Sequence, residues 1–579
     1  MGVTAIIATG ACGSSKKGFN GFTDDGGISE SGGSSGGGGS GSSSGSLFGE
    51  GGGGGDSGDY TDPTTCAEAE SSHSYIGCDY WPTMTANVVW NIFDFAAVVA
   101  NAGTTTANIT ITGPGTAGNQ TGTVPPGGLT KFYLPWVTVL KGQDADNCGD
   151  GVAFTSSVLA HGAAYHLVSS VPVTVYQFNA LEYQGAGGPT GKDWSSCPGD
   201  TACSNPLSPA YGEKSGCFSF SNDASLLLPS TAMTGNYRVT GHGGWTTGNT
   251  GSYMAITAIN ANTTVNIKVS STGSIAAGGG IATTGAGGSL TLTMGAGDVA
   301  ELVGGPTDAS DLSGSLIQAS GPIQVITGMP CLNVPDGAAA CDHVEESNLP
   351  AETLGADYVV AMPMGPNGKA VGHNVRIYGN FDNTTLTYTP SAPPGCPTTI
   401  NAGEVVDCGM ALGSICEDED GLYIAPCGAG NIVETDFEVK GSNSFAVGDF
   451  TLGGSLVDAK AAAGTQQGDP DQSMATAVAQ FRQNYVFLAP DDYEDNWAVI
   501  IAPTGTTVSI DGTPVTATPT VVGSYNILRT QIATGSQNGA HTLVASNPVG
   551  LQVMGYGAYT SYTYPGGLDL KQISPPPTQ

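Results

Sequence analysis

The sequence predicts an all-β fold of four diverged tandem β-sandwich-like units that follow a disordered Gly/Ser-rich tether. The 579 residues include 90 glycines and 34 prolines. Val, Ile, Thr and Tyr fall in short runs between Gly, Asn and Pro, which is typical of β-proteins with many turns. An internal repeat divides the chain into units of sandwich size. A β-propeller-like arrangement is the alternative, because one unit could instead form two four-stranded blades.

The repeat has two landmarks. The first is an apolar strand followed by a second β-run, which begins with two threonines at Thr105, Thr263, Thr384 and Thr506. We predict that each such pair of strands forms a hairpin. The second landmark is a small turn before an alternating strand, at 170–175, 320–325, 442–447 and 546–551. Proline is tolerated at such a strand start because no ladder donor is needed there.

These landmarks predict the organisation of the chain. Residues 13–62 are dominated by Gly, Ser and Asp, so they bury too little apolar surface to fold and are predicted to be a flexible linker. The predicted β units comprise residues 63–190, 191–345, 346–465 and 466–579.

The charge balance is strongly acidic, with 49 acidic and 15 basic residues and a formal net charge of −34. Binding to a phosphate backbone requires clustered Lys and Arg, and the longest basic run is Lys16-Lys17. Nucleic acid is therefore not an expected partner.

Thirteen cysteines indicate where the protein folds. Twelve lie in the predicted β region, several in pairs about ten residues apart, and no C-x-x-C motif supports a zinc site. We predict that these twelve form disulfides, which persist in oxidising compartments. They are Cys66, Cys78, Cys148, Cys197, Cys203, Cys217, Cys331, Cys341, Cys396, Cys408, Cys416 and Cys427.

The remaining cysteine, Cys12, follows a short apolar run that ends in small residues. Residues 1–12 resemble the end of a bacterial lipoprotein signal, in which cleavage leaves the cysteine to carry lipid. We predict lipidation of Cys12, with an unmodified cysteine as the alternative. No run approaches the 18 apolar residues of a membrane-spanning helix, so a lipid anchor is the only membrane attachment expected. The predicted location is the outer membrane, the cell surface or the extracellular space.

No catalytic motif is present, since both G-x-S-x-G and H-E-x-x-H are absent. We therefore predict a protein that is not an enzyme and needs no cofactor. The cluster Asp342-His343-Val344-Glu345-Glu346 has the residue types for acid–base or metal chemistry, but it follows Cys341 and could equally be a polar network that braces a disulfide loop.

Acidic loops provide the candidate calcium ligands, because calcium prefers several oxygen ligands. The best candidates are Asp144, Asp146 and Asp150, and the loops at 417–420 and 491–496 are similar. Solvated acidic loops are the alternative.

Four tyrosines crowd the last predicted strand and the loop after it. Tyrosines on loops form contact surfaces for protein or glycan, and the alternative is that they cap the last core. They are Tyr556, Tyr559, Tyr562 and Tyr564.

Several motifs resemble one family. Cys66, the run from Tyr75 through Thr83, Gly328-Met329-Pro330-Cys331, Cys341 through Glu346 with Leu349-Pro350, and the closing stretch from Gly555 to Gly567 resemble bacterial proteins that share a region with the IgG-Fc-binding protein of mucus. The resemblance extends from about residue 66 to residue 570. It implies a binding function, but fold similarity alone does not transfer a ligand, and no Fc-contacting residue is assigned.

The leading hypothesis is an extracellular, surface-tethered recognition or adhesion protein that binds a protein or a glycan. The alternatives are an extracellular hydrolase with an unrecognised site and a self-associating structural protein of an envelope or matrix.

Overall fold

A computed structural model describes residues 62–577, apart from 147–150, 152, 199–216, 247, 336–340, 410–414, 418–422, 427–431, 459–460, 462–465 and 534–538. The predicted lipoprotein signal, Cys12 and all but the last residue of the predicted linker lie outside the described residues.

The prediction of an all-β fold is confirmed in its coarse form, because antiparallel β-sheets contain most of the regular secondary structure in the described part of the chain. The described helices are short. They are α1 (Cys66–Ser72), η1 (Thr116–Gly118), α2 (Thr138–Lys141), η2 (Trp194–Ser196), η4 (Ala351–Thr353), α4 (Gly454–Val457) and η5 (Val478–Gln480).

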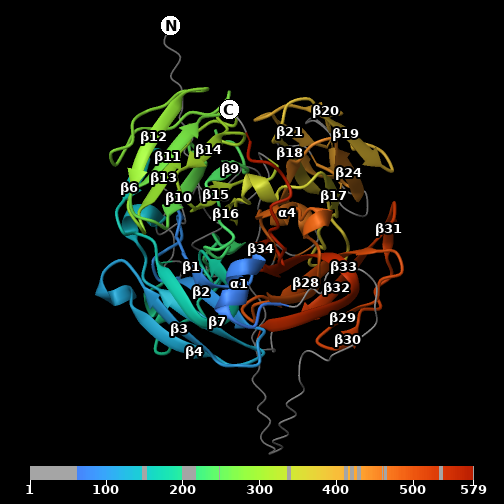
Figure 1. The fold of residues 1–579 in the computed structure, drawn as a ribbon, viewed down its shortest axis with the longest axis horizontal. Helices are drawn as coiled ribbons and strands as arrows, with labels where there is room; N and C mark the ends of the chain where they lie inside the picture. Colours follow the sequence, from blue (N-terminus) through green and yellow to red (C-terminus); the bar gives the residue numbers. More distant parts are fainter. Residues whose placement is uncertain are drawn as a thin grey trace, which may run out of the picture.

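The strands fall into four groups with the same connectivity, which we call units one to four (Figure 1). Each unit has two sheets that share one crossing strand, which is continuous in units one and four and interrupted in units two and three. Unit one contains β1 (Gly77–Tyr80), β2 (Phe95–Asn101), β3 (Ala107–Thr112), β4 (Gln120–Val124), β5 (Gly128–Leu134), the crossing strand β7 (His166–Phe178) and β8 (Ala224–Leu226).

Unit two has the same order of strands with an interrupted crossing strand. It contains β9 (Asn236–Arg238), β10 (Tyr253–Ala258), β11 (Thr263–Lys268), β12 (Ser289–Met294), β13 (Val299–Val303), the crossing pair β14 (Leu316–Ala319) and β15 (Ile323–Leu332), and β16 (Asp342–Ser347).

Unit three follows the pattern of unit two. It contains β17 (Asp357–Val360), β18 (His373–Gly379), β19 (Thr384–Thr389), β20 (Thr399–Ile400), β21 (Val405–Cys408), the crossing pair β24 (Phe437–Gly441) and β25 (Phe445–Thr451), and β26 (Gln472–Met474); β22 (Ile415–Glu417) and β23 (Tyr423–Pro426) form a separate pair.

Unit four again has one long crossing strand. It contains β27 (Arg482–Leu488), β28 (Asp495–Pro503), β29 (Val508–Ile510), β30 (Thr513–Pro514), β31 (Thr520–Val522), β32 (Tyr525–Ala533), the crossing strand β33 (Ala540–Gly557) and β34 (Thr560–Pro565).

Strand alternation explains how each unit closes over a core. Along β3 the side chains of Ala107, Ile109 and Ile111 are buried and the residues between them are exposed, which is the period of two for a half-buried strand. In contrast, every residue of β2 is buried. In unit two, side chains from both sheets meet in a single cluster that includes Val265 of β11 and Ile256 of β10.

The hairpin prediction is wrong. The strand before each threonine run pairs with the crossing strand in the sheet that contains the last strand of the unit. The threonine run pairs with the crossing strand in the other sheet, which contains the first strand of the unit. The short link between the two strands therefore passes from one sheet to the other. Left-handed backbone at Asn262, Asn383 and Gly505 makes this tight change of direction possible in units two to four.

One hydrogen bond joins the two landmarks of the repeat in all four units. The hydroxyl oxygen of the turn serine accepts a hydrogen bond from a backbone N–H at the start of the third strand, at 2.9–3.0 Å. The serines are Ser170, Ser320, Ser442 and Ser546, and the donors are Asn108, Thr264, Thr385 and Thr507. The structural equivalent of the threonine pair in unit one is therefore Ala107-Asn108, two residues after the start that the sequence suggests.

Several strand pairs join residues on opposite sides of a predicted unit boundary. The boundaries themselves stay predictions. β8 lies after residue 190 but pairs with β7, and β26 lies after residue 465 but pairs with β25. β6 (Val158–Ala160) lies before residue 190 but pairs with β13 of unit two.

The four units form a closed ring around their last strands, which we call the inner strands (Figure 1). β8 contacts β16, β16 contacts β26, β26 contacts β34, and β34 contacts β8. The ring closes between units one and four. There the Tyr75 N–H donates to the Leu568 carbonyl oxygen at 3.2 Å, and Arg482 pairs with Asp62 and Asp569.

Candidate functional site

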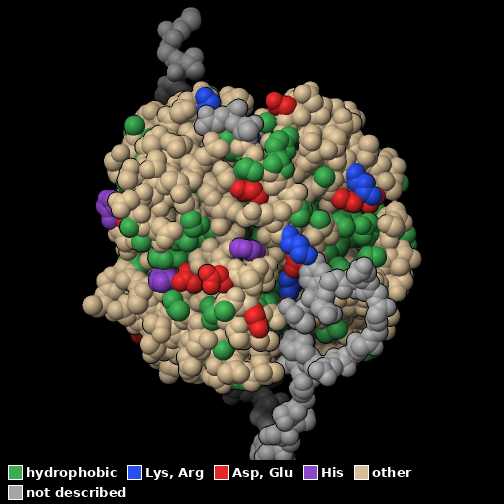
Figure 2. Space-filling view, in the orientation of Figure 1, with side chains coloured by type: hydrophobic (Ala, Val, Ile, Leu, Met, Phe, Trp, Pro, Cys, Tyr) green, Lys and Arg blue, Asp and Glu red, His purple; other side chains and the backbone are tan. Residues whose placement is uncertain are grey.

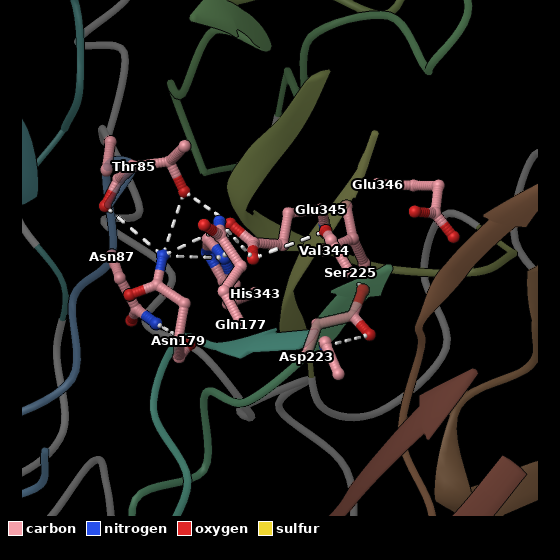
Figure 3. Close-up of polar contacts among 12 residues, drawn as sticks. Thr85, Asn87, Gln177, Asn179, Asp223, Ser225, His343, Val344, Glu345 and Glu346 are labelled. Carbon is pink, nitrogen blue, oxygen red and sulfur yellow. Dashed lines mark hydrogen bonds and ion pairs between the residues drawn. The ribbon is translucent and has the colours of Figure 1, made fainter. Parts of the chain in front are cut away.

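The cluster Asp342–Glu346 forms most of β16, the inner strand of unit two. All five of its residues are at most 1% exposed. Residues from three other segments surround it, so the sequence cluster is one side of a larger buried network (Figure 3).

Glu345 is the most heavily hydrogen-bonded member of this network. Its carboxylate accepts hydrogen bonds from Thr85 Oγ1 at 2.8 Å, Gln177 Nε2 at 2.9 Å and Ser225 Oγ at 3.3 Å. All three donors come from unit one. A buried carboxyl group needs polar partners to replace water, so unit one supplies the hydrogen bonds of a side chain that belongs to unit two.

His343 lies beside Glu345, with its Nε2 atom 3.5 Å from Glu345 Oε2 and 3.1 Å from Asn179 Nδ2. Asn179 Nδ2 also lies 2.8 Å from Thr85 Oγ1. The other ring nitrogen, Nδ1, has no hydrogen-bond partner among the described residues. The histidine, the carboxylate and the amide therefore lie in one network, as Figure 3 shows.

Asp342 and Asp223 each connect three units at the start of the inner strands. Asp342 accepts hydrogen bonds from the Asn222 N–H of unit one at 2.7 Å and from Thr560 Oγ1 of unit four at 3.1 Å. Asp223 accepts from the N–H groups of Glu345 and Gln472 at 2.9 and 3.1 Å, in units two and three. These carboxylates therefore bind the ring together at its axis.

Two further carboxylates of unit three face this pair. Burial raises the pKa of Asp342 well above its ordinary value, and the charge of Asp469 raises it further. Burial likewise raises the pKa of Asp223, with an added contribution from Asp471. Burial also raises the pKa of Asp471, to about 7. The axis thus contains two pairs of interacting carboxyl groups.

This arrangement is buried and joins strands of different units. The network residues Thr85, Gln177, Asn179, His343 and Glu345 are at most 1% exposed. Within the described ranges, no group of three His, Cys, Asp or Glu side chains is placed to hold a metal ion. The sequence signal at Asp342–Glu346 therefore marks a buried polar network, and its described partners extend far beyond the neighbouring disulfide loop.

A second carboxyl pair, Asp94 and Glu182, lies nearer the surface. Burial, a hydrogen bond and the charge of Asp94 together raise the pKa of Glu182 to about 8, against the lowering effect of Lys192. Lys192 forms ion pairs with both carboxylates, and the Asp94 side chain is 24% exposed.

The best predicted calcium loop is only partly described. The Asp144 carboxylate accepts hydrogen bonds from Lys141 Nζ at 2.6 Å and from the Asn91 N–H at 2.9 Å, so protein donors occupy it. The Asp146 carbonyl oxygen accepts from Trp90 Nε1. Asp150 lies outside the described residues, and calcium binding at this loop stays a prediction.

The tyrosine surface prediction is wrong for three of its four residues. Tyr556, Tyr562 and Tyr564 lie on β33 and β34 and are at most 1% exposed. Tyr562 and Tyr564 pack against unit one, whereas Tyr556 packs in a cluster with Val359 and Ala361 of unit three. Tyr564 packs on Tyr176 of unit one, with ring centroids 4.7 Å apart. Tyr559 is half-buried and contacts the ring of Phe220.

Eight of the twelve cysteines predicted to form disulfides are paired, as Cys66–Cys78, Cys197–Cys217, Cys331–Cys341 and Cys396–Cys408. Among the described cysteines none is free. Cys148, Cys203, Cys427 and the side chain of Cys416 lie outside the described residues. These bonds indicate an extracellular or otherwise oxidising compartment. None of the described helices is long and apolar enough to cross a membrane.

Sequence reasoning missed the partners of β16, because they are far apart in the chain. One signal could have found some of them. An aspartate begins or precedes the inner strand in three units, at Asp223, Asp342 and Asp471. Alignment of the units by their strands places these residues at one end of the axis.

Comparison with known proteins identifies the family. A family model described as IgGFc binding protein matches residues 223–555. No curated protein matches the chain. The matched residues include all of units two and three and most of unit four, and they cover more than half of the 579 residues. The chain therefore belongs to the IgGFc binding protein family.

Proposed function

We propose that this protein is an extracellular recognition protein, whose ring of sandwich-like units presents a binding surface for a protein or glycan ligand. The observation that carries the proposal is the family match over residues 223–555. The disulfides support an extracellular setting.

The arrangement of buried and exposed groups supports binding at the outer surface. The polar network at the axis holds strands together, so a ligand would contact the loops and sheet faces around it. Figure 2 shows one such face, with few Lys and Arg side chains and small, separate groups of acidic ones. A face of this kind suits a neutral or basic partner better than a polyanion.

Immobilised full-length protein tests the proposal directly. Native IgG Fc, Fc without its glycan and Fab fragments would be passed over it in a surface plasmon resonance experiment. Binding of both Fc forms but not Fab would identify a protein ligand, and binding of native Fc alone would identify a glycan. If neither Fc form binds and a glycan array also gives no signal, the recognition function is wrong.

Surface tethering is part of the proposal. A lipid on Cys12 would hold the ring at a bacterial surface, and adhesion would follow from ligand binding. Intact-mass analysis of the amino-terminal peptide from the native envelope tests this point, because an unmodified cysteine would contradict the lipid anchor.

The hydrolase alternative depends on a specific observation, the raised pKa of Glu182 beside Asp94. A carboxyl group with a pKa of about 8 is protonated at neutral pH and can serve as a general acid. Hydrolysis of glycan or peptide substrates that the Glu182→Gln variant loses would favour this alternative, provided that ligand binding is retained.

A further inference from the structure

The start of the inner strands contains carboxyl groups from three units, with few groups to neutralise them. Asp223, Asp342, Asp469 and Asp471 are at most 1% exposed. As far as the described residues go, no Lys, Arg or His contributes to the interactions that shift their pKa values.

The hydrogen bonds divide the four groups into two well-solvated and two poorly solvated carboxyls. Asp223 accepts three backbone N–H bonds, from Ala224, Glu345 and Gln472. Asp342 accepts two backbone N–H bonds and one hydroxyl hydrogen bond. Such donors stabilise a carboxylate anion.

Asp471 has the opposite environment. Among the described residues neither of its carboxyl oxygens has a hydrogen-bond partner. The hydroxyls of Thr451, Ser561 and Thr563 are near enough to lower its pKa, but they make no hydrogen bond of normal geometry to it. Ser561 instead donates to the Asp469 carbonyl oxygen. Asp469 itself has one carboxyl oxygen without a partner.

A buried anion without donors or a counter-ion costs several kcal/mol, so such a group takes up a proton. We propose that each carboxyl pair at the axis, Asp223 with Asp471 and Asp342 with Asp469, holds one proton at neutral pH. The ring is then a pH-sensitive closure, in which loss of these protons places two like charges between units and loosens the inner strands.

The surroundings of the pairs contain further titratable groups, but they add little positive charge. The nearby basic side chains are His343, which lies beside Glu345, and His373, which bonds Asp449 at 2.7 Å. The other groups that face the axis from the packed elements are Glu345, Glu346, Glu301 and Asp449 and the phenols of Tyr253, Tyr493, Tyr556, Tyr562 and Tyr564.

The expected pH dependence follows from proton binding. In the unfolded chain an aspartate loses its proton near pH 4, whereas in the folded protein burial raises the pKa of Asp471 to about 7 and the pKa of Asp342 and Asp469 well above the ordinary value. The stabilisation is therefore complete below about pH 4 and is lost as the pH rises through about 7. For each retained proton, the unfolding equilibrium constant rises about tenfold per pH unit within this window.

The test is urea unfolding of the full chain at pH 5 to 8, with the Asp471→Asn variant beside the wild type. The neutral amide removes one titrating group. The rise in the unfolding equilibrium constant per pH unit should therefore be about tenfold smaller for the variant than for the wild type. Asp308→Asn is the control, because Asp308 binds Thr246 at the surface and should leave the slope unchanged. Equal slopes for the wild type and Asp471→Asn would overturn the proposal.

Two measurements on the wild type keep the test valid if the variant does not fold. Infrared difference spectra should show the carbonyl band of a protonated carboxylic acid at pH 7, and this band should disappear at alkaline pH. Absence of the band would refute the claim that the carboxyl pairs retain protons. Elemental analysis should find no stoichiometric metal. A bound divalent cation would replace the protons and overturn the proposal.

Discussion

The ion pair between units two and three allows a quantitative test of how strongly the ring is joined. Arg376 on β18 is 5% exposed, and its Nη2 atom lies 2.7 Å from Asp311 Oδ2 of unit two. Burial alone would raise the pKa of Asp311, but Arg376 and hydrogen bonds from Ser313 hold this pKa below its ordinary value. We predict that Arg376→Met leaves Asp311 as an uncompensated buried charge.

The magnitude follows from the burial of each partner. Removal of one member of a buried ion pair costs about 3–5 kcal/mol. The second partner, Asp407, is 36% exposed, so its bond to Arg376 adds only about 0–1 kcal/mol. We expect Arg376→Met to lower the free energy of unfolding by about 3–5 kcal/mol, and the double variant with Asp311→Asn to recover at least about 2 kcal/mol of the summed losses.

Urea denaturation of the four proteins in this double-mutant cycle measures the coupling. Lys440→Met is the matched control, because the Lys440 side chain is 51% exposed in its pairs with Asp357 and Glu438 and should contribute less than about 1 kcal/mol. A loss below about 1 kcal/mol for Arg376→Met, or additive effects in the cycle, would refute the conclusion that this pair joins the units.

Three further predictions use other parts of the ring. The paired Cys331→Ser and Cys341→Ser variant should lose roughly 3 kcal/mol of unfolding free energy, the loop-closure value for a separation of 10 residues, as measured by urea unfolding; no loss would show that the bond contributes nothing. Tyr564→Phe should lower the free energy of unfolding by about 1 kcal/mol, because the buried Tyr564 hydroxyl donates to the Leu488 carbonyl oxygen, and ligand binding should be unchanged. Weaker ligand binding at unchanged stability would instead restore the contact-surface hypothesis. Ser442→Ala should cost about 0.5–1 kcal/mol in thermal or urea unfolding, since the Thr385 N–H then loses its acceptor; a neutral effect would mean that water replaces the serine.

Much of the architecture could be predicted from local sequence signals. Short apolar runs between turn residues identify strands, and the spacing of Cys66 and Cys78 or of Cys396 and Cys408 identifies disulfides. Sheet assignment could not be predicted in this way. The apolar strand and the threonine run that follows it are as close in sequence as the two strands of a hairpin, but the link between them crosses from one sheet to the other. Only the pairing of all strands in the unit distinguishes a hairpin within one sheet from a link between two sheets.

The polar centre shows the same limit more strongly. Asp342–Glu346 is visible as a cluster in the sequence, but Thr85 and Asn179, which contact it, are more than 160 residues away. Their positions depend on how four units close into a ring, which no local pattern encodes. The tyrosines near the carboxyl end illustrate the converse, since an aromatic-rich loop and a buried seam between units have the same composition.

The seam where the ring closes has a mechanical consequence. The described chain begins at Asp62, which is held by Arg482 of the last unit, and Tyr75 is bonded to the segment that follows the last strand. Tension transmitted through residue 62 is therefore carried first by these side-chain and backbone bonds, before any strand of a sheet is pulled. These few bonds can break one at a time, whereas the strands of a sheet are held by many hydrogen bonds. We therefore expect a load applied at residue 62 to separate units one and four at this seam before the units themselves unfold.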